Sequence, residues 1–245
     1  MANAALAVLE SALRAKKLDR TLTSALPALE RTDAAALVST GVPTLDACLR
    51  GGLPRGHLSE ICGPASSGRT TLLLTLVAEA TRRGEIAAIV DTFDRLDVAS
   101  AIAAGADLER LLWVRGDSAS GAALVDRAID RALKAVNLVL QAGGFGVVAL
   151  DVADVPLLAL KRIPFTTWMR IQRIVEGSDT ACVLVVPQPM ARSAGGVTLA
   201  LEGHAAWAGD SDRSRRLDGL QAEARIVSPR RKVEGTVRVR CTAGC

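Results

Sequence analysis

From residue 57 onward, short apolar runs alternate with longer amphipathic ones. Five short runs are rich in valine, leucine, isoleucine or alanine and are bounded by turn residues: 57–62, 85–91, 111–114, 145–151 and 181–188. Such runs predict strands that are buried on both faces. The longer stretches between them have helical periodicity: 70–83, 98–104, 122–141 and 164–177. This order predicts the α/β class, with a mostly parallel sheet covered by helices on both faces.

The first 38 residues differ from this core. Leu6, Leu9 and Leu13 follow one another at helical spacing, and an alanine-rich connector containing Pro27 comes next. The pattern predicts an amphipathic helix, whose leucine stripe either docks on a partner or folds back on its own core. We therefore divide the chain into an N-terminal helix and connector, residues 1–38, and a core domain, residues 39–245.

The last third of the chain changes character from Ala191. Residues 209–219 have the composition of a loop, and residues 222–241 predict a strand, a basic turn and a second strand, which make a C-terminal β-hairpin. The turn carries Arg230, Arg231 and Lys232. This cluster is either a solvated turn or a surface for a DNA backbone or a protein partner.

Composition narrows the function classes. The 245 residues are 49% hydrophobic and 23% charged, which is typical of one globular domain with a sizeable core. The net charge of +4 permits an acidic partner without establishing one. Three phenylalanines, three tryptophans and no tyrosine limit base stacking, so any DNA binding would be mostly electrostatic and weak.

The five cysteines form no CxxC pair and have no histidines at zinc spacing, so we expect reduced thiols and no metal site. Charges interrupt the N-terminal segment too early for a signal peptide, and no apolar run reaches about 18 residues. We expect a cytoplasmic protein with no membrane partner.

A glycine-bounded segment, "GPASSGRT", lies between a predicted strand and a predicted helix. It differs at one position from the phosphate-binding P-loop, where the backbone N–H groups and the following helix N-terminus surround phosphate oxygens. Arg69 stands where the motif has lysine; it keeps the charge but changes the shape of the donor. The candidate nucleotide-binding residues here are Gly63, Ser66, Ser67, Gly68, Arg69, Thr70 and Thr71, with the Thr70 hydroxyl as a Mg²⁺ ligand.

The apolar strand "FGVVALD" ends in Asp151. A carboxylate at this place after a P-loop would hold Mg²⁺ through water. The alternative is an aspartate that caps the next turn.

Four segments together carry a resemblance: "STGVPTLDACLRGGLPRGHLSEICGPASSGRTTLL", "IVDTFDRLD", "VVALD" and "VVPQ". In this order and spacing the chain resembles the ATPase core of the RecA recombinase family, over about residues 39–196. The short chain and altered motifs resemble its ImuA group, which belongs to bacterial damage-inducible mutagenesis cassettes.

The resemblance also shows where the chain departs from the family. RecA-like enzymes carry a glutamate, at the position of Phe93, that activates the attacking water. Asp94 is adjacent but would point to the opposite face of an extended chain. Asp97 matches an aspartate that contacts adenine, whereas Ser100 replaces the aromatic that stacks on it. Gln188 matches the glutamine that senses the γ-phosphate.

The two DNA-binding loops that the resemblance implies are poor in basic residues. The loop after Gln188 reaches Gly195 and Gly196 with Arg192 as its only base, and the loop at residues 154–164 offers Lys161 and Arg162. Neutralising several phosphates would need more cations than these.

The resemblance and the departures from it imply a non-catalytic RecA-like accessory protein of SOS-induced mutagenic translesion synthesis. Its implied partners are a RecA recombinase, an inactive Y-family polymerase homologue and the DNA polymerase associated with it. We expect no required cofactor, with ATP and Mg²⁺ binding weak or absent. The alternatives are a slow DNA-dependent ATPase of the RecA family and a cell-division inhibitor of the SulA type.

Overall fold

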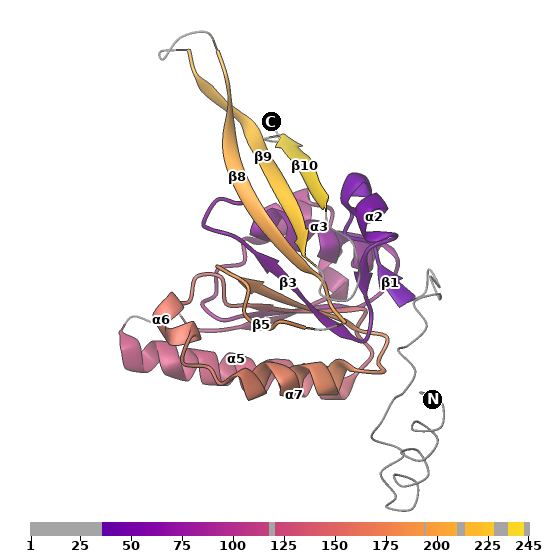
Figure 1. The fold of residues 1–245 in the computed structure, drawn as a ribbon, viewed down its shortest axis with the longest axis vertical. Coiled ribbons are helices and arrows are strands. Elements are labelled where there is room, and N and C mark those ends of the chain that lie inside the picture. The colour runs from indigo at the N-terminus through magenta and orange to yellow at the C-terminus, as the bar shows by residue number, and fades with distance from the viewer. Residues whose placement is uncertain (1–35, 118–120, 194, 210–213, 228–234, 243–245) are drawn as a thin grey trace, which may run out of the picture. The chain divides into compact units, whose positions relative to one another are not determined.

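The computed structural model describes residues 36–117, 121–193, 195–209, 214–227 and 235–242 (Figure 1). Two predicted features lie outside these residues: the N-terminal helix with Leu6, Leu9 and Leu13, and the basic turn with Arg230, Arg231 and Lys232. They remain predictions.

The core is an eight-stranded sheet in the order β10-β9-β8-β3-β7-β6-β4-β5. Its strands are β3 (His57–Cys62), β4 (Ala87–Asp91), β5 (Leu111–Arg115), β6 (Val147–Asp151), β7 (Ala181–Val186), β8 (Thr198–Ala208), β9 (Arg216–Val227) and β10 (Gly235–Thr242). Neighbours from β8 to β5 are parallel, and β8, β9 and β10 pair antiparallel. A separate antiparallel pair joins β1 (Leu37–Val38) to β2 (Leu53–Pro54). The predicted α/β class with a mostly parallel sheet is confirmed.

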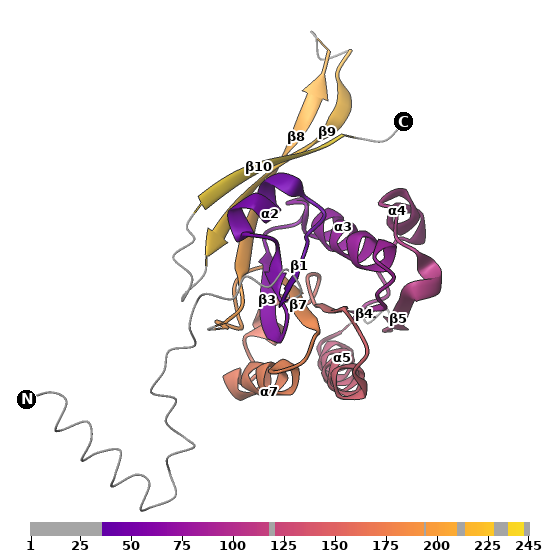
Figure 2. The same cartoon turned by 90° about the vertical axis from the view of Figure 1, so that its right-hand side faces the viewer.

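Helices cover both faces of the sheet, as predicted. The helical elements are α2 (Pro43–Leu49), α3 (Arg69–Arg82), α4 (Val98–Ala103), the 3₁₀ turn η2 (Leu108–Arg110), α5 (Ala122–Ala142), α6 (Leu157–Leu160) and α7 (Phe165–Val175). Figure 2 shows α3 on one side of the parallel strands and α5 with α7 on the other. Among the described helices, none has the length and apolar character needed to span a bilayer.

The strands are apolar at successive positions because each face meets a different helical layer. In β4, Ala87 and Ile89 join the core under α3, whereas Ala88 and Val90 join the core under α5 and α7. Burial on both faces replaces the alternation of an exposed sheet with a continuous apolar run. These continuous apolar runs are the signal by which the inner strands can be predicted from the sequence.

The C-terminal part of the sheet was only partly predicted. The β9–β10 hairpin is confirmed, with Gly235 opposite Ile226 and Thr242 opposite Gly219. Strand β8 was not predicted, and β9 begins at Arg216, inside the stretch expected to be a loop. Pairing between β8 and β9 along their length overrides the weak strand propensity of the alanines and glycines there.

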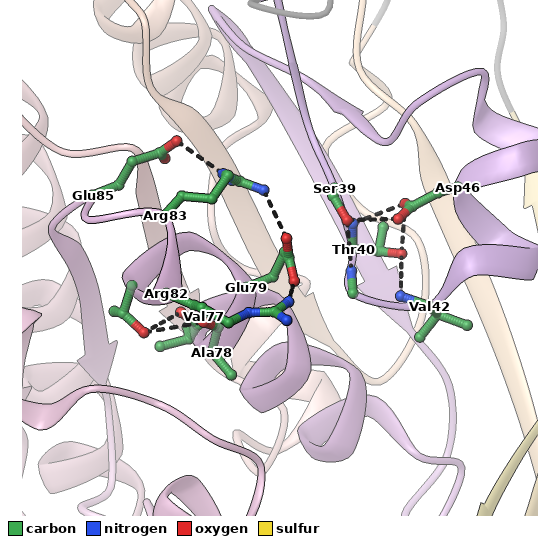
Figure 3. A network of polar contacts seen from close by, with 12 residues as sticks. Ser39, Thr40, Val42, Asp46, Val77, Ala78, Glu79, Arg82, Arg83 and Glu85 are labelled. Atoms are coloured by element: carbon green, nitrogen blue, oxygen red, sulfur yellow. Dashed lines mark hydrogen bonds and ion pairs between the residues drawn. The ribbon is translucent and has the colours of Figure 1, made fainter.

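Short polar networks fix the turns around α2 and α3 (Figure 3). The Asp46 carboxylate accepts hydrogen bonds from the Ser39 hydroxyl at 2.6 Å and from the Thr40 N–H and hydroxyl at 2.8 Å each. At the end of α3, Arg83 donates to both Glu79 and Glu85. These bonds set where each helix begins or ends relative to the sheet.

Arg55 links several elements at the amino-terminal edge of the sheet. Its guanidinium donates to the Asp179 carbonyl at 2.7 Å, to the Gly146 carbonyl at 3.4 Å and to the Glu85 carboxylate at 2.7 Å. The side chain is 13% exposed. Its bonds connect segments that precede β4, β6 and β7.

We predict that Arg55→Met lowers the free energy of unfolding by about 1–3 kcal/mol, since the part-buried Glu85 carboxylate and Gly146 carbonyl lose a charged donor. Arg83→Ala is the matched control: it also removes a Glu85 partner but is 32% exposed, so its loss should stay below about 1 kcal/mol. Urea unfolding measures both. Equal small losses would contradict a linking role for Arg55.

Candidate nucleotide site

The candidate site lies at the carboxyl edge of the parallel sheet. The glycine loop follows β3, Gln188 follows β7 and Asp151 ends β6. The register places Cys62 opposite Val186, and Asp151 between Val185 and Asp91 on the neighbouring strands. Because the strand ends are aligned, residues from four separate sequence segments meet at one edge, which is the usual ligand edge of such sheets.

The glycine loop is held in shape by close backbone packing. Ser66 has a φ of 60° and Gly68 a φ of 92°, both in the left-handed region. A Cβ on Gly63 would lie 2.4 Å from the Leu201 carbonyl oxygen, and one on Gly203 would lie 2.4 Å from the Ser66 carbonyl oxygen. The loop therefore packs directly on β8. Gly203 was missed from the sequence because the strand that carries it, β8, was itself not predicted.

Two polar atoms in the loop are buried without a partner among the described residues. They are the Ser67 hydroxyl and Nη1 of Arg69. Ser67 is fully buried and Arg69 is 7% exposed, whereas Ser66, Thr70 and Thr71 are exposed. Buried donors normally find acceptors. Both fit an anion such as a phosphate group, so this part of the predicted site retains suitable chemistry.

Asp151 is half-buried by side-chain exposure, but its carboxyl group is strongly desolvated. Burial raises the pKa of Asp151 from 3.8 to about 6; the hydrogen bond from the Ala153 N–H opposes this, and Asp91 and Asp154 add to it. The charge of Arg69 lowers the pKa of Asp151 only slightly in comparison. The Ala153 bond, 2.9 Å, is the turn-capping contact of the alternative interpretation.

Asp91 was not singled out from the sequence. It is 3% exposed, and its Oδ2 accepts from the Leu96 N–H at 2.8 Å and from the Trp113 indole at 3.2 Å. These bonds hold the loop that follows β4. An aspartate that ends a buried strand is the signal that could have identified it.

Phe93 is 9% exposed and packs in the apolar core beneath α5 and α7. The adjacent Asp94 has a φ of 58° and receives two hydrogen bonds from Arg115, at 2.8 and 2.7 Å. Arg115 also lies 4.4 Å from the Trp113 ring centroid. The family's glutamate position is thus occupied by a core side chain, and the neighbouring carboxylate is held in an ion pair.

Asp97 is the N-cap residue of α4. Its carboxylate accepts from the Ser100 N–H at 2.9 Å and from the Ser100 hydroxyl, and these bonds lower the pKa of Asp97. Both residues are exposed. The carboxylate predicted to contact adenine therefore already caps a helix.

The segment after β7 is held close to β3 and β8. Oε1 of the buried Glu60 accepts from the Met190 and Ala191 N–H groups at 2.7 Å each, and its Oε2 accepts from the Thr198 hydroxyl at 3.1 Å. Gln188 is half-buried at the start of this segment, and Arg192 is exposed with a φ of 47°. The role of Glu60 was missed; its signal was a charged residue inside an apolar strand.

Within the described residues, no cluster of three or more histidine, cysteine, aspartate or glutamate side chains is arranged to hold a metal ion. Cys48, Cys62 and Cys182 are free thiols. Burial is the main cause that raises the pKa of Cys62 and of Cys182 to about 12, so neither is a reactive thiolate.

Together, the sheet order and the glycine loop define a RecA-type α/β nucleotide-binding fold. The model of the RecA N-terminal domain matches residues 9–156, which is more than half of the chain. The protein therefore belongs to the RecA family.

Curated relatives agree with this membership. The chain is 46% identical to the RecA protein of Prochlorococcus marinus over 104 residues, 42% of this chain and 28% of that protein. It is 40% identical to the RecA protein of Rubrobacter xylanophilus over 117 residues, 47% of this chain and 31% of that protein. For the RecA protein of Desulfotalea psychrophila the identity is 38% over 120 residues, 49% and 31% of the two chains. The matched region thus spans less than a third of each relative.

We predict that Asp151→Asn stabilises the protein above pH 6. Because folding raises this pKa, the folded state binds the proton more tightly, and the resulting stability is complete below pH 3.8 and lost as the pH rises to about 6. Asparagine stays neutral and still accepts the Ala153 bond. Urea unfolding at pH 8 should show a gain of at most about 3 kcal/mol, which vanishes near pH 4.

Asp154→Asn is the control for this prediction, since Asp154 is close in sequence but its side chain is 55% exposed. Its free energy of unfolding should change by less than about 0.5 kcal/mol. A loss of stability in Asp151→Asn at pH 8 would show that the charged carboxylate is stabilising and contradict the prediction.

Proposed function

We propose that this protein is a non-catalytic RecA-like accessory protein of SOS-induced mutagenic translesion synthesis in the cytoplasm. One observation carries the proposal: Phe93 occupies the position of the family's water-activating glutamate and packs in the core. Membership of the RecA family supports a role in DNA repair or recombination.

The neighbouring carboxylates support the absence of turnover. Asp94 is paired with Arg115, and Asp91 accepts hydrogen bonds from the Leu96 N–H and the Trp113 indole. Asp151 ionises with a pKa of about 6 and ends a different strand. A general base must reach the proton it removes, and these groups are committed to other contacts.

A second candidate is a slow DNA-dependent ATPase of the RecA family. The observation that favours it is the pair of unpartnered buried donors, Ser67 Oγ and Arg69 Nη1, in the glycine loop. They supply anion-binding chemistry that an entirely inactive loop would not need.

As partners we propose a RecA recombinase, an inactive Y-family polymerase homologue and its associated DNA polymerase. Contacts with DNA would be weak and electrostatic, through Arg192, Arg230, Arg231 and Lys232. The loop at residues 154–164 adds little positive charge for DNA binding, because Arg162 is paired with Asp126. Lys161 is exposed.

We predict that the wild-type protein does not turn over ATP and that Arg69→Lys alone does not restore turnover. Loss of a general base typically costs a factor of about 10²–10⁴, which the lysine does not recover. Phosphate release measured with and without single-stranded DNA tests this. Clear hydrolysis that Asp151→Ala abolishes would favour the slow ATPase.

We predict that deleting residues 1–24 weakens association with a RecA-type recombinase, since the leucine stripe of Leu6, Leu9 and Leu13 suits docking on a neighbouring core. The deletion leaves the described residues intact, so cooperative melting should persist and serves as the folding control. Association is measured by pull-down and titration with the full chain as reference. Unchanged affinity would reject this docking surface and direct attention to the C-terminal hairpin.

A further inference from the structure

The segment that joins β7 to β8 is attached to the neighbouring strand β3. We call its described part, residues 188–193 and 195–197, the strap. Near its end, the Val197 N–H donates to the Ser59 hydroxyl at 3.1 Å, and the Val197 carbonyl accepts from the Glu60 N–H at 2.8 Å. Val197 and both residues of β3 are buried. The strap is therefore bound to β3 through main chain and side chain.

The Glu60 carboxylate attaches the strap to β3 at a second place. Glu60 is 1% exposed, and the three hydrogen bonds that its carboxylate accepts come from the Met190 N–H at 2.7 Å, the Ala191 N–H at 2.7 Å and the Thr198 hydroxyl at 3.1 Å. A buried carboxylate that loses its donors is strongly unfavourable. The strap cannot leave β3 without leaving this buried charge unpaired.

Close packing adds to these bonds. A Cβ on Gly196 would lie 1.9 Å from the Leu58 carbonyl oxygen, so the main chains of the strap and of β3 are in direct contact. From α7, the Gln172 side chain donates to the Ala191 carbonyl at 3.4 Å. The strap is thus held by a strand and by a helix at once.

Arg192 is the residue of the strap that this attachment presents to solvent. It is exposed between the buried Ala191 and Ser193. Its φ of 47° lies in the left-handed region, which is uncommon for a residue other than glycine. Such a conformation persists where the surrounding structure enforces it. The anchored residues on either side therefore fix the backbone from which the Arg192 side chain projects.

We infer that Glu60 is a lock that keeps the strap in one closed conformation without any ligand. Glu60 acts as a positioning residue: its charge holds Met190 and Ala191, and these hold Arg192 in a fixed place at the surface. Whatever contacts Arg192 meets a segment that is already formed. The inference goes beyond the proposed function and is independent of it, because the resting shape of the strap does not depend on whether ATP is hydrolysed.

Trypsin cleavage after Arg192 in the full chain measures release of the strap, because a protease cuts the opened form. The wild type should be cut slowly at this bond although the side chain is exposed. Glu60→Gln keeps the shape and an acceptor oxygen but removes the charge, and it should speed cleavage about tenfold, since charge-assisted hydrogen bonds are about twice as strong as neutral ones. Glu60→Ala should speed it further. Unchanged cleavage in both variants would overturn the lock.

Two controls separate release of the strap from a general loss of stability. Glu202→Gln removes the same charge from an exposed position on β8, and it should leave cleavage after Arg192 at the wild-type rate. Cleavage after Arg127, an exposed residue within helix α5, reports unfolding elsewhere in the chain. If Glu60→Gln speeds cleavage after Arg127 by the same factor as after Arg192, the whole fold has weakened and the lock is rejected.

Hydrogen exchange gives a second, local readout. The Met190 and Ala191 amides should exchange slowly in the wild type and about tenfold faster in Glu60→Gln, whereas the Leu150 amide in β6 should not change. Millimolar Mg-ATP or an excess of a single-stranded oligonucleotide should leave the wild-type rates unchanged. Slowing of the Met190 and Ala191 amides by more than about tenfold with either ligand would show that the strap closes only around a ligand, and would overturn the inference.

Gly196→Ala tests the lock without changing Glu60. The added methyl group would press on the Leu58 carbonyl and should also speed cleavage after Arg192. If the strap opens as one unit, combining Gly196→Ala with Glu60→Ala should add little to the larger single effect, because both changes release the same contacts. Fully additive effects would mean that the two attachments open separately, and would contradict a single lock.

Discussion

The parallel sheet must bury both of its faces, and the rest of the molecule depends on this requirement. Because α3 covers one face and α5 with α7 covers the other, the inner strands are largely apolar, and polar residues gather mainly where the strands end. The register aligns the carboxyl ends of β3, β7, β6 and β4, so one edge collects the glycine loop, Gln188, Asp151 and Asp91. The candidate site is a consequence of how the core is packed.

The polar residues near this edge fall into two groups: those that make several hydrogen bonds within the protein, and those with atoms that lack a partner among the described residues. Glu60 and Asp91 are buried; Glu60 accepts three hydrogen bonds and Asp91 accepts two through Oδ2, and each fixes a loop in place. Ser67 and Arg69 are buried with unsatisfied atoms, and Asp151 is desolvated enough to hold its proton to about pH 6. Complete networks stabilise a loop, whereas incomplete ones leave free energy for a ligand to recover.

The sequence predicted the parts of the fold in which one signal dominates. Strands β3, β4, β6 and β7 were found because double burial gives continuous apolar runs, and the glycine loop because its spacing is distinctive. Strand β8 was missed because its alanines and Gly203 have weak strand propensity and its pairing with β9 is a tertiary effect. For the same reason the bonds of Glu60 could not be predicted, because its partners in residues 190–198 are brought near only by folding. The Asp97 cap is local, since its partner Ser100 is three residues on, and an aspartate directly before a predicted helix is the signal that could have identified it.

The contact between the glycine loop and β8 gives the loop a structural role that does not depend on any ligand. Gly63 lies against the backbone of Leu201, and Gly203 lies against the backbone of Ser66, so a side chain at either glycine would force two main chains apart. The loop is a structural joint between the parallel strands and the antiparallel ribbon that follows. Its shape is therefore maintained by the need to fold, and substitutions such as Arg69 and Phe93 can alter the chemistry while leaving the architecture intact.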